Sequence, residues 1–142
     1  MISHKSIVVW SLVFIFIVSF FACSRRSVPI INYDDVSFTS RSDKTLSLDD
    51  VNKALAIAAV AKQWKLSDTR PGHATATYIV RGKHTVVVDI TYTEKTLSIK
   101  YKNSTNMLYD KDKDGNETIH TNYNRWVSNF ITEVNKELLE LK

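Results

Sequence analysis

The chain has 142 residues, of which 24% are charged and 44% hydrophobic. These values exclude a disordered chain and a polytopic membrane protein, and with an apolar leader set aside they leave room for one domain of about 100 residues. The formal net charge of +4 comes from basic residues scattered among acids, whereas a nucleic-acid-binding surface clusters them on one face. We therefore expect a single folded domain that does not bind nucleic acid.

The first 22 residues are typical of a secretory signal peptide. A short polar stretch that carries Lys5 precedes an almost wholly apolar run over 7–21. Because such a leader is cut off after export, we expect residues 1–22 to be removed from the mature protein. Their removal takes away one lysine and leaves 18 basic and 15 acidic residues, a net charge of +3.

The end of the apolar run, Ser19-Phe20-Phe21-Ala22-Cys23, resembles the lipobox of bacterial lipoproteins. In that motif a peptidase cuts before a cysteine that has received a diacylglycerol thioether. Ala22 and Cys23 fit the motif, whereas Phe20 and Phe21 stand where a Leu-like and a small residue are usual. Cys23 is also the only cysteine, so no intrachain disulfide can form. The resemblance implies lipidation of Cys23 and a tether that holds the domain at a membrane.

The residues after Cys23 bear on the compartment. Ser24 rather than Asp follows the cysteine, and lipoproteins of this kind in two-membrane bacteria usually reach the outer membrane. We therefore expect a lipid-anchored protein at the outer membrane of a Gram-negative bacterium, facing the periplasm. The alternative is an uncleaved signal anchor with a cytoplasmic domain, because the apolar run reaches the lower length limit for spanning a bilayer and Arg25 and Arg26 resist translocation.

Residues 23–44 form the expected spacer, which begins at the lipidated cysteine, is rich in Ser, Arg and Asp, and ends in a short edge strand near 36–39.

A helix is predicted next, from Ser47 to about Trp64. Its start, Ser47-Leu48-Asp49-Asp50, resembles a capping box, in which the serine hydroxyl accepts a backbone N–H of the first turn. Apolar residues then recur at helical spacing: Val51, Ala54, Leu55, Ala58 and Ala59.

From Ala74 the hydrophobic period changes to two, which predicts strands over 75–81, 84–93 and 96–102. The links between them are so short that adjacent strands must pair antiparallel. After a polar loop over 103–118, an apolar stripe predicts an amphipathic helix of about five turns. The stripe consists of Val127, Phe130, Ile131, Val134, Leu138 and Leu141.

The predicted fold class is therefore α+β. Residues 45–142 are expected to form one domain in the order α-β-β-β-α. We expect a two-layer sandwich, in which a three-stranded antiparallel meander carries both helices on its one apolar face.

An acidic run lies within the polar loop. Asp110-Lys111-Asp112-Lys113-Asp114-Gly115-Asn116 matches the first half of an EF-hand calcium loop, with oxygen ligands at alternate positions and a glycine for the sharp turn. The second half does not match, because Thr121 occupies the twelfth position, where a bidentate glutamate belongs. Asp110, Asp112 and Asp114 as metal ligands are one interpretation. An Asp-Gly turn in a solvated connector is the other.

The sequence indicates no enzyme and no cofactor. It contains no Gly-Xaa-Ser-Xaa-Gly elbow, no Gly-rich phosphate loop and no His-Glu-Xaa-Xaa-His motif. His73, His84 and His120 stand far apart without the spacing of a zinc site, so we expect surface or helix-capping roles for them.

The most distinctive segment is Ile119-His120-Thr121-Asn122-Tyr123-Asn124-Arg125-Trp126-Val127, preceded by a second one from Tyr101 to Tyr109. Both are similar to segments of a group of small uncharacterised proteobacterial lipoproteins. The resemblance spans roughly residue 54 to the C-terminus and includes Trp64. It implies a lipid-anchored envelope domain and implies no activity.

This segment has two interpretations. In the structural one, Tyr109, Tyr123 and Trp126 pack the loop onto the sheet, while Asn122 and Asn124 satisfy open N–H groups at the helix start. In the functional one, amides and large amphipathic rings form a partner surface. That surface would consist of Tyr109, His120, Asn122, Tyr123, Arg125 and Trp126.

The leading functional hypothesis is a non-enzymatic envelope lipoprotein that is held at the membrane by its N-terminal lipid. Its domain is expected to bind another envelope component, a protein, through the loop between the third predicted strand and the last helix. A small-ligand or calcium-binding module that uses the 103–118 loop is the alternative, and an enzyme ranks third. The sequence gives no indication of an oligomeric state.

Overall fold

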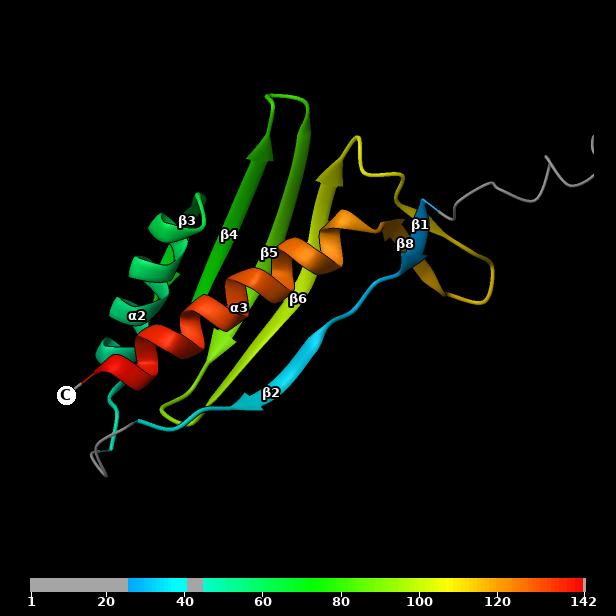
Figure 1. Ribbon diagram of the computed structural model, residues 1–142. Helices are drawn as coiled ribbons and strands as arrows, with labels where there is room; N and C mark the ends of the chain where they lie inside the picture. Colours follow the sequence, from blue (N-terminus) through cyan, green and yellow to red (C-terminus); the bar gives the residue numbers. More distant parts are fainter. Residues whose placement is uncertain (1–25, 41–44, 142) are drawn as a thin grey trace, which may run out of the picture.

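The computed structural model describes residues 26–40 and 45–141 (Figure 1). The expected signal segment over 1–22 and Cys23 lie outside these residues. None of the described helices is both long and apolar enough to cross a bilayer. The elements in chain order are β1 (Ser27–Pro29), β2 (Tyr33–Ser37), α2 (Leu48–Ala61), β3 (Trp64–Arg70), β4 (His73–Val80), β5 (His84–Tyr92), β6 (Thr96–Thr105), β7 (Asp110–Lys111), β8 (Glu117–His120) and α3 (Asn122–Glu140).

Strands dominate the described residues and form two antiparallel sheets. The larger sheet has five strands in the order β2-β6-β5-β4-β3, and the smaller has three in the order β1-β8-β7. The predicted α+β class is confirmed. The predicted three-stranded meander is wrong as a description of the whole sheet, because β4, β5 and β6 are its centre and β3 and β2 extend it on either side.

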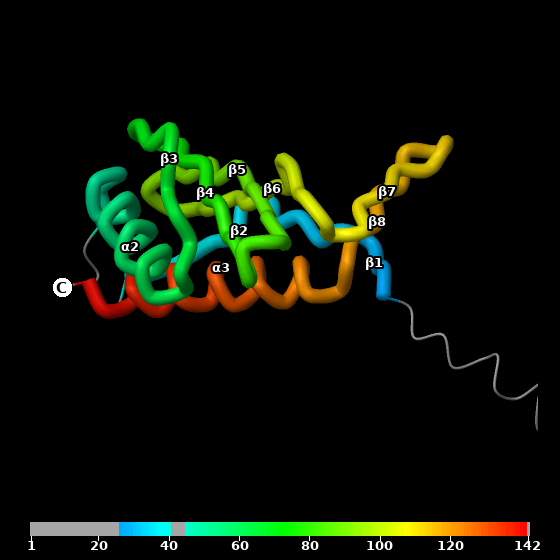
Figure 2. Tube along the Cα trace, turned by 90° about the horizontal axis from the view of Figure 1, so that it is seen from above, coloured from blue at the N-terminus to red at the C-terminus, as the bar shows by residue number. Residues whose placement is uncertain are grey.

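The large sheet buries one face, which the two described helices cover (Figure 2). Along β5, Val86, Val88 and Ile90 are fully buried, whereas the intervening Val87 and Asp89 are not. This alternation follows from the two-residue period of a strand that has a core on one side only. The helices supply the other half of the core with residues that are each fully buried: Val51, Ala54, Leu55 and Ala58 from α2, and Val127, Phe130, Val134 and Leu138 from α3.

Helix α2 begins as predicted and ends early. The Ser47 hydroxyl accepts the Asp50 N–H at 3.2 Å, and the Asp50 carboxylate accepts the Ser47 N–H at 3.0 Å, so the capping box is confirmed. The helix stops at Ala61 because Gln63 adopts a left-handed conformation, with φ of +62°. The predicted extension to Trp64 is therefore wrong, and Trp64 instead begins β3.

The spacer predicted over 23–44 contains two strands, β1 at 27–29, which was not predicted, and β2 at 33–37, which overlaps the edge strand expected near 36–39. Strand β1 pairs with β8, with Val28 opposite Ile119, and strand β2 pairs with β6, with Tyr33 opposite Ile99. Proline within β1 is compatible with this position, because β1 is an edge strand. Strand β1 therefore begins only four residues after Cys23.

Both edges of the large sheet are irregular. In β2 the register shifts between Tyr33 and Val36, where Asp35 has a φ of +46°. In β3 it shifts between Ser67 and Arg70, where Asp68 also has a φ of +46°. Such bulges bend a strand and interrupt its row of backbone hydrogen-bonding groups. Each edge therefore offers only short runs of regular strand.

Candidate functional site

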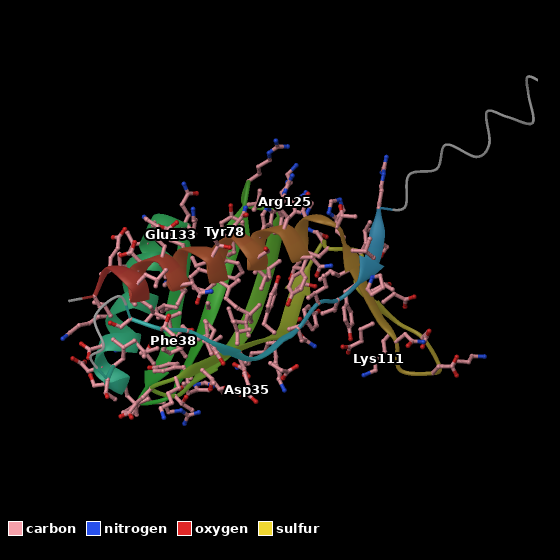
Figure 3. All side chains as sticks on the ribbon, turned by 60° about the horizontal axis from the view of Figure 1, so that its bottom comes forward. Asp35, Phe38, Tyr78, Lys111, Arg125 and Glu133 are labelled. Atoms are coloured by element: carbon pink, nitrogen blue, oxygen red, sulfur yellow. The ribbon has the colours of Figure 1, made fainter. Side chains whose placement is uncertain are left out.

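A cleft of about 300 Å³ lies between the start of α3 and the turn that joins β4 to β5. Figure 3 labels one of its residues, Arg125, near the N-terminal end of α3. The lining comes from segments that are far apart in the sequence, and we call the hollow the α3 cleft. It is lined by Val80, Arg81, His84, Met107, His120, Asn122, Arg125 and Trp126.

The β4–β5 turn brings Arg81 to the cleft in an uncommon conformation. Arg81 and Gly82 both have positive φ, at +52° and +63°, and the Lys83 N–H donates to the Val80 carbonyl at 3.1 Å. Turns with two positive φ values favour Asn and Gly, because a larger side chain is strained there. An arginine at the first position therefore makes the turn less stable than Asn or Gly would.

His84, the first residue of β5, is held by a neighbouring loop. Its Nδ1 lies 2.8 Å from the Asn106 carbonyl oxygen, and because a carbonyl can only accept, Nδ1 is the donor. The Asn106 amide in turn donates to the Lys83 carbonyl at 2.8 Å. These two contacts tie the β4–β5 turn to the segment after β6, so that this wall of the cleft is fixed in place.

The other wall is the first turn of α3, which is capped by a histidine. The Asn122 N–H donates to His120 Nδ1 at 3.2 Å, so the neutral ring carries its proton on Nε2. Thr121, at the N-cap position, makes no side-chain cap, and the first turn holds no acidic residue. The Arg125 guanidinium donates to the Asn122 side-chain oxygen at 2.9 Å, which orients both residues.

The expectation that asparagines cap this helix is wrong. Asn122 accepts from Arg125 instead, and Asn124 reaches across to the segment between β1 and β2. The Asn124 side chain accepts the Ile31 N–H at 3.0 Å and donates to the Pro29 carbonyl at 2.9 Å. Asn124 therefore attaches the segment between β1 and β2 to α3. His120 caps the helix instead, which is one of the roles predicted for the histidines.

Apolar side chains form the inner part of the cleft. Met107 is only 3% exposed, and the Trp126 ring packs edge-on against Tyr78 with 5.2 Å between ring centroids. Tyr78 in turn stacks on Trp64, which stacks on Phe130. The aromatic series connects the cleft to the core, so the position of Trp126 is set by rigid packing.

The charges around the cleft are unbalanced. Arg81, Arg125, His84 and His120 form no salt bridge with any described residue, and the cleft lining holds no carboxylate. The α3 cleft therefore combines two uncompensated guanidinium groups with two imidazoles.

A second polar cluster lies on the helix-free face of the large sheet, and its charged groups are paired with one another. The Asp89 carboxylate accepts from Lys102 at 2.8 Å and from Thr75 at 3.0 Å, and His73 lies 3.6 Å away. The Lys102 hydrogen bond is the main reason why the pKa of Asp89 lies below its ordinary value. Because this cluster balances its own charges, it is a poorer candidate for binding a charged ligand.

Two of the six residues predicted for the partner surface lie outside the cleft. Tyr123 is fully buried, so it belongs to the core as in the structural interpretation. Tyr109 is 40% exposed, stacks on Tyr101 with 4.8 Å between centroids and donates its hydroxyl to Glu117 at 2.9 Å. That hydrogen bond is the main reason why the pKa of Tyr109 is raised. His120, Asn122, Arg125 and Trp126 are brought together in the cleft.

The acidic run forms the turn between β7 and β8. Asp112 Oδ1 accepts the N–H groups of Asp114 at 2.9 Å and Asn116 at 2.8 Å, and its other oxygen accepts the Asn116 side-chain amide. The Asn116 side chain is the largest cause of the lowered pKa of Asp112. Asp110 and Asp114 are exposed, and the described residues contain no group of three or more His, Cys, Asp or Glu side chains that could hold a metal ion.

The sequence did not indicate that Arg81 and His84 belong to this site. The pair Arg81-Gly82 does indicate a turn, but its proximity to a helix that starts about forty residues later depends on the stacking of the whole sheet. Comparisons of the chain with models of protein families, with curated proteins and with solved structures found no match.

Proposed function

We propose that this protein is a membrane-tethered lipoprotein of the bacterial envelope whose domain is a non-enzymatic binding module. The tether is the lipidated Cys23, and the compartment is the periplasmic side of the outer membrane. The observation that supports the binding role best is the α3 cleft, which gathers four of the predicted partner-surface residues with Arg81 and His84. Both of its histidines contact backbone groups through Nδ1, and these contacts fix the orientation of the two rings.

The position of the cleft supports the same proposal. The Thr121 N–H donates to the Arg26 carbonyl at 3.0 Å, and Thr121 lies between two cleft residues, His120 and Asn122. Three residues of chain lead from Cys23 to Arg26, a reach of at most about 10 Å. A domain tethered at Cys23 would therefore present this end close to the membrane surface, where envelope partners are anchored.

Replacing Cys23 with alanine is expected to abolish membrane attachment. The acyl chains have nowhere else to attach, because Cys23 is the only cysteine, and their methylene groups supply the anchoring free energy at about 0.8 kcal/mol each. Intact mass spectrometry of the wild type should show loss of residues 1–22 and added acyl mass, and the Cys23→Ala chain should show no acyl mass. Fractionation should find the wild type with outer membranes.

The control for this experiment is Ser24→Ala, which changes the next residue and leaves the thiol in place. This variant should remain acylated. An uncleaved, unacylated wild type would contradict the proposal and would identify the 7–21 run as a membrane anchor.

A photoreactive residue at position 129 is expected to crosslink the partner protein. Asn129 is exposed and stands one turn after Arg125 on the same side of α3. Irradiation of intact cells should give a discrete adduct, and Arg125→Ala in the same chain should reduce it at least severalfold, because a guanidinium is lost from the contact surface. The adduct is measured by immunoblotting.

The matched control carries the photoreactive residue at Glu140, which is exposed at the far end of the same helix. It should give no adduct of that size. The same adduct from both positions, or one that is insensitive to Arg125→Ala, would contradict a binding role for this end of the domain.

A further inference from the structure

The α3 cleft has the chemistry of an anion site. Its lining supplies two arginines and two histidines from four places in the chain, and none of these side chains forms a salt bridge with a described residue. Guanidinium groups bind oxyanions through paired N–H donors, which makes arginine well suited to planar or tetrahedral oxyanions. A cavity with this lining favours a negatively charged ligand.

The conformation of Arg81 is an independent observation. Its φ of +52° is one that Asn or Gly would adopt with less strain. Arg81 is exposed and forms no salt bridge among the described residues that would compensate for this strain. Strained residues concentrate at binding sites. The strain is therefore accounted for if the guanidinium is placed to meet a ligand.

The arrangement of the donors favours phosphate over carboxylate. The donors come from both sides of the cleft, with Arg81 on the β4–β5 side and Arg125 and the His120 Nε2–H on the α3 side. A carboxylate has two oxygens in one plane, whereas a phosphate presents oxygens in several directions and can contact both walls at once. Met107 and Trp126 give the cleft an apolar part that would accommodate the carbon atoms of a phosphate ester.

We propose that the α3 cleft binds the phosphate group of a phosphate ester, an inference that rests on the proposed function because it names the chemistry of the same surface. Two sources share this chemistry. One is the headgroup of an anionic phospholipid, which the short connection from Cys23 to Arg26 brings within reach, and the other is a soluble phosphate ester.

The test uses the full chain in a neutral detergent and two matched pairs of probes. Glycerol 3-phosphate is compared with glycerol, and phosphatidylglycerol in mixed micelles is compared with diacylglycerol plus free glycerol, so that only one member of each pair carries a phosphate. The thermal unfolding midpoint and titration calorimetry report binding. We expect a phosphate-bearing probe to raise the midpoint and its phosphate-free counterpart to have no effect.

The arginine variants identify the site. Arg81→Ala and Arg125→Ala should each raise the dissociation constant about tenfold or more, since each removes charged hydrogen bonds to the anion. Arg70→Ala is the matched control, because it removes the same charge from an exposed position at the end of β3. It should leave the dissociation constant unchanged. Circular dichroism verifies that each variant is folded.

The outcomes separate the two sources. A response to glycerol 3-phosphate assigns the site to soluble esters, and a response to phosphatidylglycerol alone assigns it to the lipid headgroup. The inference is overturned if neither probe binds, or if Arg70→Ala weakens binding as much as the cleft variants do. An acylated chain that binds no phosphate would overturn this inference alone, and an unacylated chain that still binds it would overturn the tether alone.

Discussion

Phe130→Ala is expected to lower the free energy of unfolding by about 3–5 kcal/mol, enough to unfold a marginally stable domain. Phe130 is fully buried in α3 and stacks on Trp64 with 5.0 Å between ring centroids. Truncation removes the transfer free energy of the ring and leaves a cavity between helix and sheet, which rigid neighbours cannot fill. Urea denaturation followed by circular dichroism measures the change.

Leu139→Ala is the control for this experiment, because Leu139 lies on the same helix and is 42% exposed. It should change the unfolding free energy by less than about 0.5 kcal/mol if only burial decides the outcome. Equal losses at the two positions would show that α3 is not packed on the sheet as described. Phe130→Ala should also alter the tryptophan fluorescence of the folded state, because it removes one of the two rings, Phe130 and Tyr78, on which Trp64 stacks.

Tyr123→Phe is expected to stabilise the domain, by about 1–2 kcal/mol at neutral pH. The Tyr123 hydroxyl is buried and has no hydrogen-bond partner among the described residues. Removing it abolishes the cost of leaving a polar group without water or a partner, while the ring keeps its packing. The midpoint of urea unfolding should rise with little change in slope.

The same residue predicts sensitivity to alkali. Burial is the main reason why the pKa of the Tyr123 hydroxyl is raised well above its ordinary value of 10.0, so the folded state favours the neutral phenol. The unfolded state ionises first, so the wild type keeps its full stability below pH 10 and loses stability as the pH rises from 10 towards the pKa of the folded state. The advantage of Tyr123→Phe over the wild type should therefore widen above pH 10.

Tyr109→Phe is expected to have the opposite effect on the free energy of unfolding. Its hydroxyl is a donor to Glu117, and the ring is 40% exposed, so its removal should lower stability slightly at neutral pH. A destabilised Tyr123→Phe would contradict the prediction and would indicate that the hydroxyl has a partner in solution.

The sequence predicted those parts of the fold that depend on local signals. The one-sided alternation in β5, the capping box at Ser47 and the apolar stripe of α3 each depend on residues that are close together in the sequence. Strand β3 was missed because the left-handed residue after α2 is Gln63 and not the glycine that usually marks a helix end, so Trp64 resembled one more helical apolar position.

Strand β1, which was not predicted, and strand β2, of which only the end near 36–39 was predicted, pair with distant partners. Strand β1 meets β8 about ninety residues away, and β2 meets β6 about sixty-five residues away. Short polar strands such as Tyr33–Ser37 carry little periodicity of their own and are stabilised mainly by their neighbours. The candidate site behaves in the same way. His120, Asn122, Arg125 and Trp126 were found because they belong to one short segment, whereas Arg81 reaches them only through the packing of the sheet.

The bulges at Asp35 and Asp68 have a consequence for a protein held at a membrane as proposed. Anchoring confines the copies to a thin layer, where they collide far more often than they would at the same amount in free solution. A straight, regular edge would invite one copy to add a strand to the next and start a chain of them. The bulges at both edges of the large sheet, in Tyr33–Ser37 and Trp64–Arg70, disfavour such strand addition between crowded copies.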